Sequence, residues 1–250
     1  MSKIALKTPD EINIMRRSGK IAATVLTELS KVAKEGMTTS DLDLLAEAMI
    51  IKAGGKPSFK GFHGYPASLC VSINDEVVHG IPGDRKLKNG DIVGLDIGVL
   101  LEGYHSDTAI TIAIGEVSEQ AKKIMNVTKQ SLANGLAKIK AGAYLGDAQF
   151  AIQKTIESAG FSVIRDLTGH GVGRELQEAP TIPNYGQKGK GLKLEEGMCL
   201  AIEPMTAIGD FRVECLSDGW TIVTANGSLS AHFEHTIVVT KDGCEILTKV

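Results

Sequence analysis

The sequence lacks the features that define several protein classes. It has four cysteines in 250 residues, none of them in a Cys-x-x-Cys pair, and we expect reduced thiols rather than a disulfide scaffold. It has no block of basic residues, and its net charge of −3 argues against direct nucleic-acid recognition as the main function. It also lacks an apolar N-terminal segment and any run near the ~18 apolar residues of a membrane span. We therefore expect a cytoplasmic protein without membrane attachment.

Helical and strand-like stretches alternate along the chain. Thr8-Pro9-Asp10-Glu11 has the pattern of a capping box with proline at the first helical position, and it predicts a helix that ends at Gly36. Further helices are predicted at about 40–53, 119–139 and 146–159. Strand-like sequence is expected over 69–114 and from 161 onward. The order helix, helix, strands therefore occurs twice.

The two occurrences also resemble each other residue by residue. At offsets of 106 or 107, matching pairs recur in the same order: Lys34 and Lys140, Gly36 and Gly142, Asp41 and Asp147, His63-Gly64 and His170-Gly171. We infer a single α+β domain over 1–250, built from two pseudo-symmetric halves at about 8–115 and 116–250. Each half is expected to hold a helix pair packed on antiparallel strands.

The segment IVGLDIGVLLEGYHSDTAITIAIG predicts a hairpin that holds two acids. Glu102-Gly103 is a plausible two-residue turn, and it places Gly98 opposite Asp107. Asp96 then shares a face with Asp107, because side chains alternate along a strand. The hairpin therefore brings two carboxylates together in very apolar surroundings.

Two further acids, Glu203 and Glu234, lie within apolar runs of the second half. A buried carboxylate is unfavourable unless it is protonated, paired or bound to a metal. Any one of these acids could lie in a turn or a surface ion pair, but four with few basic neighbours favour a cation. His170, between two glycines, then becomes a nitrogen ligand. Four carboxylates balance two divalent ions, and these ligands suit Mn, Fe, Co or Zn.

At this point the chain resembles the bacterial type I methionine aminopeptidases over essentially its whole length. The resemblance rests on GYPASLCVSINDEVVHGIP, LDIGVLLEGYHSDTA, GHGVGRELQEAPTIPNYG, GMCLAIEPM and SLSAHFEHTIVVT. It implies the pita-bread fold, which has two pseudo-symmetric halves. The internal repeat supports that fold independently.

The resemblance also implies an activity and a ligand set. The reaction would be removal of the initiator methionine from nascent polypeptides, by attack of a hydroxide held at a two-metal centre. Glu203 would also accept and donate a proton. Asp107 and Glu234 would bridge the ions, with Asp96 on one ion and His170 and Glu203 on the other.

Other residues follow from the same resemblance. His79 would lie near the scissile amide, where the residues alone indicate only a turn histidine. The methionine pocket would be formed by Phe62, His63, Tyr65, Cys70, Leu176 and Trp220. Three positions depart from the family: Gln177 replaces a histidine that contacts the substrate carbonyl, Leu176 replaces a frequent aromatic residue, and Gly98 replaces a common threonine. Gln177 can still donate a hydrogen bond, so we predict an active enzyme with a reduced rate.

The implied substrates are polypeptide N-termini with a small second residue, and the ribosome is a candidate docking partner of a monomeric enzyme. Two alternatives stay open. One is another aminopeptidase of this fold, such as a proline-directed enzyme, although those usually carry an N-terminal domain for which a helix from Thr8 leaves no room. The other is a non-catalytic pita-bread binding module, against which the full ligand set argues.

Overall fold

The first helix pair forms where the local capping signals lie. The computed structural model describes residues 4–250. Helix α1 (Pro9–Val32) begins with the predicted capping box, since the Thr8 hydroxyl accepts from the Glu11 N–H and the Glu11 carboxylate accepts from the Thr8 N–H. Helix α2 (Thr39–Lys52) begins with a second reciprocal box, between Thr38 and Asp41. The predicted end of α1 at Gly36 is wrong, because the backbone is already extended at Ala33.

The second helix pair repeats this arrangement. Helix α3 (Glu119–Leu136) is capped by the Ser118 hydroxyl, and α4 (Leu145–Ser158) follows after a short connection. The predicted end of α3 at Ile139 is three residues too late. The N–H groups of Lys138 and Ile139 bond three residues back instead of four, so the chain tightens into a turn there.

Most strands belong to two larger sheets. A four-stranded sheet has the order β1-β4-β2, with β5 paired to β4. A five-stranded sheet has the order β15-β14-β9-β7-β8. The first contains β1 (Lys56–Pro57), β2 (Leu69–Ile73), β4 (Ile92–Leu101) and β5 (Tyr104–Ala113). The second contains β7 (Thr168–Gly171), β8 (Glu178–Pro183), β9 (Cys199–Ile202), β14 (His235–Val239) and β15 (Cys244–Ile246).

Two three-stranded sheets complete the architecture. Their strand orders are β13-β10-β6 and β11-β12-β3, so β3 of the first half pairs with a strand of the second half. The strands are β3 (Glu76–Val78), β6 (Ser162–Val163), β10 (Met205–Ala207), β11 (Val213–Cys215), β12 (Ile222–Thr224) and β13 (Ser230–His232). A short 3-10 turn, η1 (Phe62–Gly64), precedes β2.

The hairpin register is the one that the sequence predicts. Strands β4 and β5 pair antiparallel, with Ile97 opposite Thr108 and Gly98 opposite Asp107. The turn residues Glu102 and Gly103 both have positive φ, at 48° and 84°. Two successive residues with positive φ match the right-handed twist of the strands that they join. The turn therefore fixes which face of the hairpin carries the acids.

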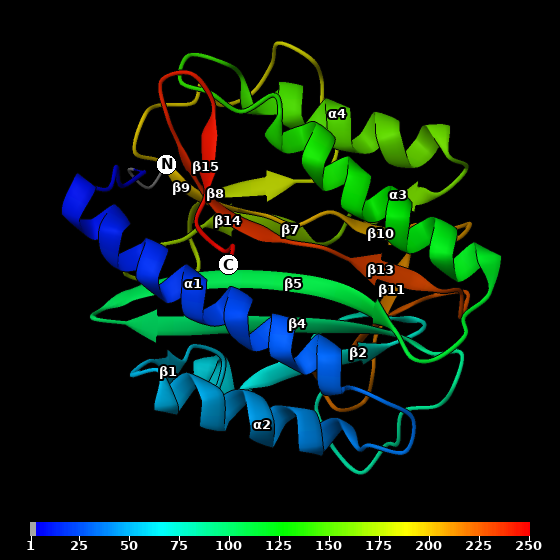
Figure 1. The fold of residues 1–250 in the computed structure, drawn as a ribbon. Coiled ribbons are helices and arrows are strands. Elements are labelled where there is room, and N and C mark those ends of the chain that lie inside the picture. Colours follow the sequence, from blue (N-terminus) through cyan, green and yellow to red (C-terminus); the bar gives the residue numbers. More distant parts are fainter. Residues whose placement is uncertain (1–3) are drawn as a thin grey trace.

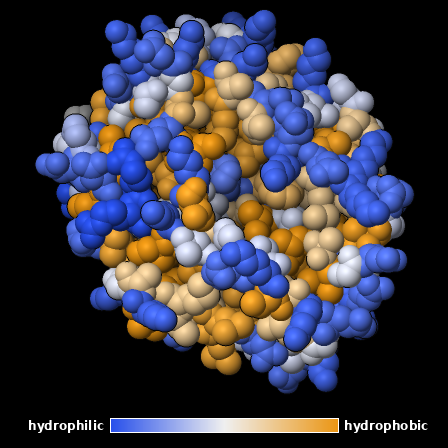
Figure 2. All heavy atoms as spheres, in the orientation of Figure 1, coloured by the Kyte–Doolittle hydropathy of each residue, from blue (hydrophilic) through white to orange (hydrophobic). Residues whose placement is uncertain are grey.

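Each helix pair covers its own hydrophobic core. In Figure 1, α2 lies at the bottom of the molecule and α3 and α4 at the top, while α1 crosses in front of β4 and β5. One buried cluster joins α1 and α2 to β2 and β4, and another joins α3 and α4 to β9 and β14. Over the lower part of the face in Figure 2, where α2 lies, hydrophobic side chains are visible, and α2 exposes Leu44, Leu45 and Ile51. The boundary between the halves near 115 stays a prediction.

Side-chain bonds join β5 to β14 across the centre of the molecule. The Thr236 hydroxyl donates to the Asp107 carbonyl at 2.8 Å and accepts from the Asp107 N–H at 2.9 Å. The Thr108 hydroxyl donates to the Glu234 carbonyl at 2.8 Å, and the Glu234 N–H donates to the Ala109 carbonyl at 2.9 Å. These bonds place Asp107 and Glu234 side by side, although they are far apart in sequence.

Candidate metal centre

The predicted acids and the predicted imidazole face one central cavity. The cavity has a volume of about 330 Å³. Strand β4 supplies Asp96, β5 supplies Asp107, and β7 supplies His170. Glu203 directly follows β9, and Glu234 directly precedes β14. Strands from both larger sheets therefore deliver one polar cluster to the cavity.

The cluster is compact enough to hold a metal ion. Ligand atoms of Asp107, His170 and Glu234 all lie within 4.8 Å of one another. His170 Nε2 lies 3.9 Å from Asp107 Oδ2 and 3.5 Å from Glu203 Oε1. Three carboxylate oxygens, from Asp96, Asp107 and Glu234, are buried without a hydrogen-bond partner among residues 4–250. Unpartnered carboxylate oxygens facing each other are the environment that a cation stabilises.

The tautomer of His170 also fits metal binding. Its Nδ1 lies 2.9 Å from the carbonyl oxygen of Gly171, and a carbonyl can only accept, so Nδ1 must carry the proton. The lone pair is then on Nε2, the nitrogen nearest the acids. A histidine ligand commonly uses its second nitrogen in this way, which fixes the ring orientation. Burial lowers the pKa of His170, so the ring stays neutral as a ligand must.

The acids themselves are strongly perturbed. Burial raises the pKa of Asp96 to about 7, against hydrogen bonds from Asp107 and the Ile97 N–H that favour its charged form. Burial also raises the pKa values of Asp107, Glu203 and Glu234, and the charges of neighbouring acids add to the effect. These groups repel one another when all are ionised. Divalent cations would remove that repulsion.

An apolar wall forms another part of the cavity lining. Tyr65, Cys70 and Leu176 belong to one buried cluster, against which Phe62 and Trp220 pack. The rings of Tyr65 and Trp220 meet edge to face, with centroids 5.1 Å apart. The Tyr65 hydroxyl donates to the carbonyl of Gly80 at 2.9 Å, which leaves its ring facing the cavity. The predicted residues Phe62, His63, Tyr65, Cys70, Leu176 and Trp220 all line this cavity.

Two of the remaining predicted positions, His79 and Gln177, also line the cavity, and Gly98 lies close behind it. His79, after β3, lines it with a positive φ of 60°, and burial lowers its pKa. Gln177, in the loop between β7 and β8, lines it next to Leu176. Gly98 lies behind the wall, where a Cβ would come within 2.8 Å of the Phe59 ring. The glycine therefore leaves room for Phe59, which itself lines the cavity.

Sequence reasoning missed several residues of the site. Phe59, Asp166, Thr168 and Met205 also line the cavity. His232 lies behind it, with Nε2 3.8 Å from Glu203 Oε2. Burial, and then the nearby His79, lower its pKa to about 3. The segment SAHFEH held no local signal for this contact, because β13 ends at His232 and Glu234 precedes β14, so the two residues do not share a strand face.

Comparison with known proteins places the chain in a family. Residues 13–241 match the model of metallopeptidase family M24. The chain belongs to metallopeptidase family M24. The predicted resemblance is therefore confirmed, and so is the expected dependence on a divalent metal, since the family consists of metallopeptidases.

Individual relatives of this M24 chain support the same family and fold. It is 50% identical to methionine aminopeptidase 1 of Bacillus subtilis over 99% of this chain and 100% of that protein. The crystal structure of methionine aminopeptidase from Thermotoga maritima superposes with a TM-score of 0.98 at 50% identity, over 99% of this chain and 100% of that one. A prolidase from Pyrococcus furiosus, 24% identical, shares the fold with a TM-score of 0.80 over 98% of this chain and 65% of the prolidase. These matches confirm the pita-bread fold.

Proposed function

We propose that this chain is a methionine aminopeptidase that removes the initiator methionine from new polypeptides in the cytoplasm. The observation that carries the proposal is the cavity itself, where an apolar wall faces a cluster of buried, unpartnered acids. Such a site suits an apolar first side chain at one end and a hydrolytic metal centre at the other. The names of the relatives agree with it. No helix within residues 4–250 is long and apolar enough to cross a membrane.

Five residues would hold two divalent ions, which would be Mn, Fe, Co or Zn. Asp107 and Glu234, held side by side by the bonds between β5 and β14, would serve both ions. Asp96 would complete one ligand set, and His170 with Glu203 the other. When bound, the ions would supply a Lewis acid for the scissile carbonyl and a water of lowered pKa.

The chain's own residues would position the substrate and move protons. Glu203 Oε1 lies beside His170 Nε2, where it would accept a proton from the attacking water and return it to the leaving amine. His79 would lie near the scissile amide. Gln177 would donate a hydrogen bond to the substrate carbonyl through its amide, as a weaker substitute for an imidazole.

Recognition would depend on both ends of the cavity. The wall formed by Tyr65, Cys70, Leu176 and Trp220 would contact the methionine side chain. The free amino terminus would bind at the second metal ion, which limits cleavage to the first residue. Substrates would need a small second residue because the cavity is closed around the scissile bond. We further propose that the enzyme acts as a monomer and docks at the ribosome.

The test is metal-dependent release of methionine. The full-length protein would be stripped with chelator, reloaded with Mn²⁺ or Co²⁺, and assayed on Met-Ala-Ser beside its N-acetylated form. Release from the free peptide alone is the expected result. Release from neither peptide, by protein that holds two ions, would contradict the substrate assignment. Failure to bind metal would contradict the enzyme assignment and favour a binding module.

A further inference from the structure

His232 is a buried imidazole that the proposed mechanism does not use. It lies at the end of β13, and the residue is 3% exposed. Its Nε2 is buried without a hydrogen-bond partner among the described residues. Among residues 4–250, His232 does not line the cavity, so its contact with the site runs through another side chain.

The backbone of His232 is firmly held. The Thr111 hydroxyl donates to the His232 carbonyl at 2.8 Å and accepts from the His232 N–H at 2.9 Å. His232 also pairs with Met205 in the antiparallel sheet of β10 and β13. Strand β5, which carries Asp107, thus fixes the position of His232 as well. The ring is part of the same rigid framework as the acids.

Glu203 lies between two imidazoles that can act differently. Its Oε1 is 3.5 Å from His170 Nε2, which carries a lone pair because Nδ1 donates to Gly171. Its Oε2 is 3.8 Å from His232 Nε2. One oxygen of the carboxylate therefore faces the other ligands, and the second faces a buried nitrogen that can carry a proton.

We propose that His232 is a positioning residue: with ions bound, its Nε2 closes the 3.8 Å gap to Oε2 of Glu203 and donates its proton there, which directs Oε1 toward the metal centre. The proposal rests on the proposed function, because it takes Glu203 as a metal ligand. A carboxylate that is held by a hydrogen bond has less freedom to lose when it binds an ion. Residues that orient ligands in this way commonly change metal affinity or activity by about 10- to 100-fold.

The experiment compares two substitutions at this position by Mn²⁺ binding to the full-length, chelator-stripped protein. His232→Gln keeps an amide N–H that can donate to Glu203, whereas His232→Leu fills the space without a donor. We expect the leucine variant to bind Mn²⁺ about 10-fold or more weakly and the glutamine variant to bind within about threefold of the wild type. The kcat for Met-Ala-Ser should follow the affinity order, with KM nearly unchanged.

Thr111→Val provides a graded variant. It keeps the shape of the side chain but removes both bonds that hold the His232 backbone. We expect a smaller loss of Mn²⁺ affinity than in His232→Leu, and little additional loss when the two are combined. The visible spectrum of the Co²⁺-loaded proteins gives an independent measure of ligand geometry, which should change in the leucine variant and be restored by glutamine.

The outcomes separate this proposal from the proposed function. Equal Mn²⁺ binding by the wild type and His232→Leu would overturn the role of His232 and leave the metal centre intact. Equal losses in the leucine and glutamine variants would also overturn it, since a donor would then not matter. A wild type that binds no Mn²⁺ would overturn the proposed function first. Far-UV circular dichroism establishes folding, and His232→Met replaces the leucine variant if that variant does not fold.

Discussion

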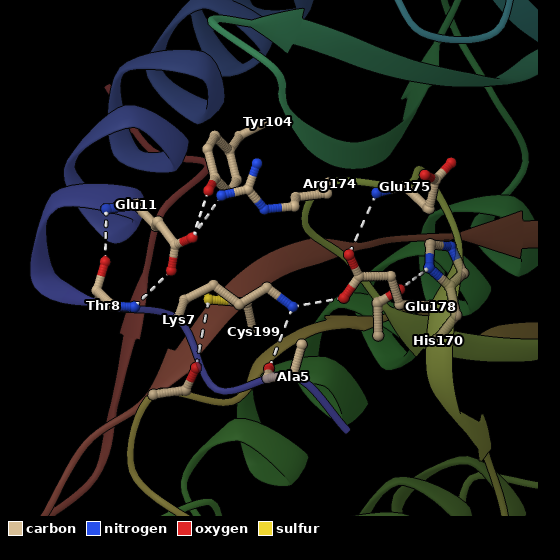
Figure 3. A network of polar contacts seen from close by, with 12 residues as sticks. Ala5, Lys7, Thr8, Glu11, Tyr104, His170, Arg174, Glu175, Glu178 and Cys199 are labelled. Carbon is tan, nitrogen blue, oxygen red and sulfur yellow. Dashed lines mark hydrogen bonds and ion pairs between the residues drawn. The ribbon is translucent and has the colours of Figure 1, made fainter. Parts of the chain in front are cut away.

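Two groups of carboxylates differ in burial and in partners: Glu11 and Glu178 near the start of α1 are half-buried and paired, whereas the four central acids are strongly buried. Figure 3 shows the group at the start of α1, where Lys7 points to Glu178 and Arg174 reaches Glu11. Glu11 also accepts from the Tyr104 hydroxyl and the Thr8 N–H, and these bonds lower its pKa to about 2. In the central cluster, burial raises the pKa values of all four acids.

The difference lies in the supply of partners. The chain provides a lysine, an arginine, a phenol and backbone N–H groups to the acids beside α1. It leaves oxygens of Asp96, Asp107 and Glu234 without any partner among residues 4–250. A carboxylate that has partners can stay ionised in the fold, whereas one that is buried without them is unfavourable unless it is protonated or binds a cation. The contrast therefore separates a structural cluster from a candidate metal centre by physical criteria.

The two groups meet at consecutive residues. Gln177 lines the central cavity, while the next residue, Glu178, bonds to Lys7 and accepts from the Glu175 N–H. Gly173 packs so closely on the Lys7–Glu178 pair that an added Cβ would lie 2.3 Å from Lys7 Cε. The ion pair thus holds the loop that presents Leu176 and Gln177 to the cavity.

The largest effect is expected at the centre of the unpartnered group. Asp107→Asn should lower kcat/KM for Met-Ala-Ser by about 10³-fold or more, because the proposed shared ligand of both ions is lost and the effect of a metal is worth several kcal/mol. The same change should not destabilise the metal-free protein, because a neutral amide removes an unpaired buried charge. Assays beside urea unfolding measure both quantities. Asp210→Asn, at an acid bonded to Arg212, is the control that should keep full activity.

The opposite behaviour is expected in the partnered group. Lys7→Met should lower the free energy of unfolding by about 2–3 kcal/mol, since Glu178, whose side chain is only 15% exposed, would lose its cation. Urea unfolding is the measurement. The control is Lys31→Met, which removes the lysine of the exposed pair with Glu28. It should change the free energy of unfolding by no more than about 0.5 kcal/mol. Equal effects of the two substitutions would remove the contrast between the groups.

The stability of the metal-free protein should depend on pH because of the unpartnered acid Asp96. The pKa of Asp96 is raised from 3.8 to about 7 on folding, so its protonated form stabilises the fold below about pH 4. That contribution is lost as the pH rises to 7. The Asp96→Asn variant does not lose this stabilisation, because its amide does not ionise. Its free energy of unfolding should exceed that of the wild type by about 2 kcal/mol at pH 7, and the two proteins should be about equal at pH 4. Chelator-treated samples unfolded at each pH test this, and a difference that is the same at both values would contradict it.

The smallest effect is expected at Gln177, where the two groups meet. Gln177→His supplies an imidazole donor and should raise kcat by up to about tenfold, while Gln177→Leu removes the donor and should lower it. Steady-state kinetics on Met-Ala-Ser separates the outcomes. If neither variant changes kcat, the amide makes no contact in the transition state.

Local signals made much of the fold predictable. The capping box at Thr8 and the Glu102-Gly103 turn act over a few residues, so the start of α1 and the register of the β4–β5 hairpin follow from sequence alone. The cation site was also predictable from local sequence. Its acids lie within apolar runs that contain few basic residues, and this pattern indicates buried carboxylates without partners.

Contacts between distant segments could not be predicted in this way. Lys7 and Glu178 are 171 residues apart, and no local pattern pairs them. The pairing of β3 with β12 and the approach of His232 to Glu203 likewise depend on how the two halves pack. The space beside Gly98 that Phe59 fills is also a property of packing, because a sequence records the glycine but not its neighbour.

The most direct test of the central claim is the Mn content of chelator-stripped protein after reloading and desalting, measured by mass spectrometry for the wild type and Asp107→Asn. The unpartnered acids predict about two ions per chain in the wild type, as in two-metal hydrolases, and a clear loss in the variant. Wild-type protein that retains no more Mn than the variant would contradict the claim that these acids are buried for cations.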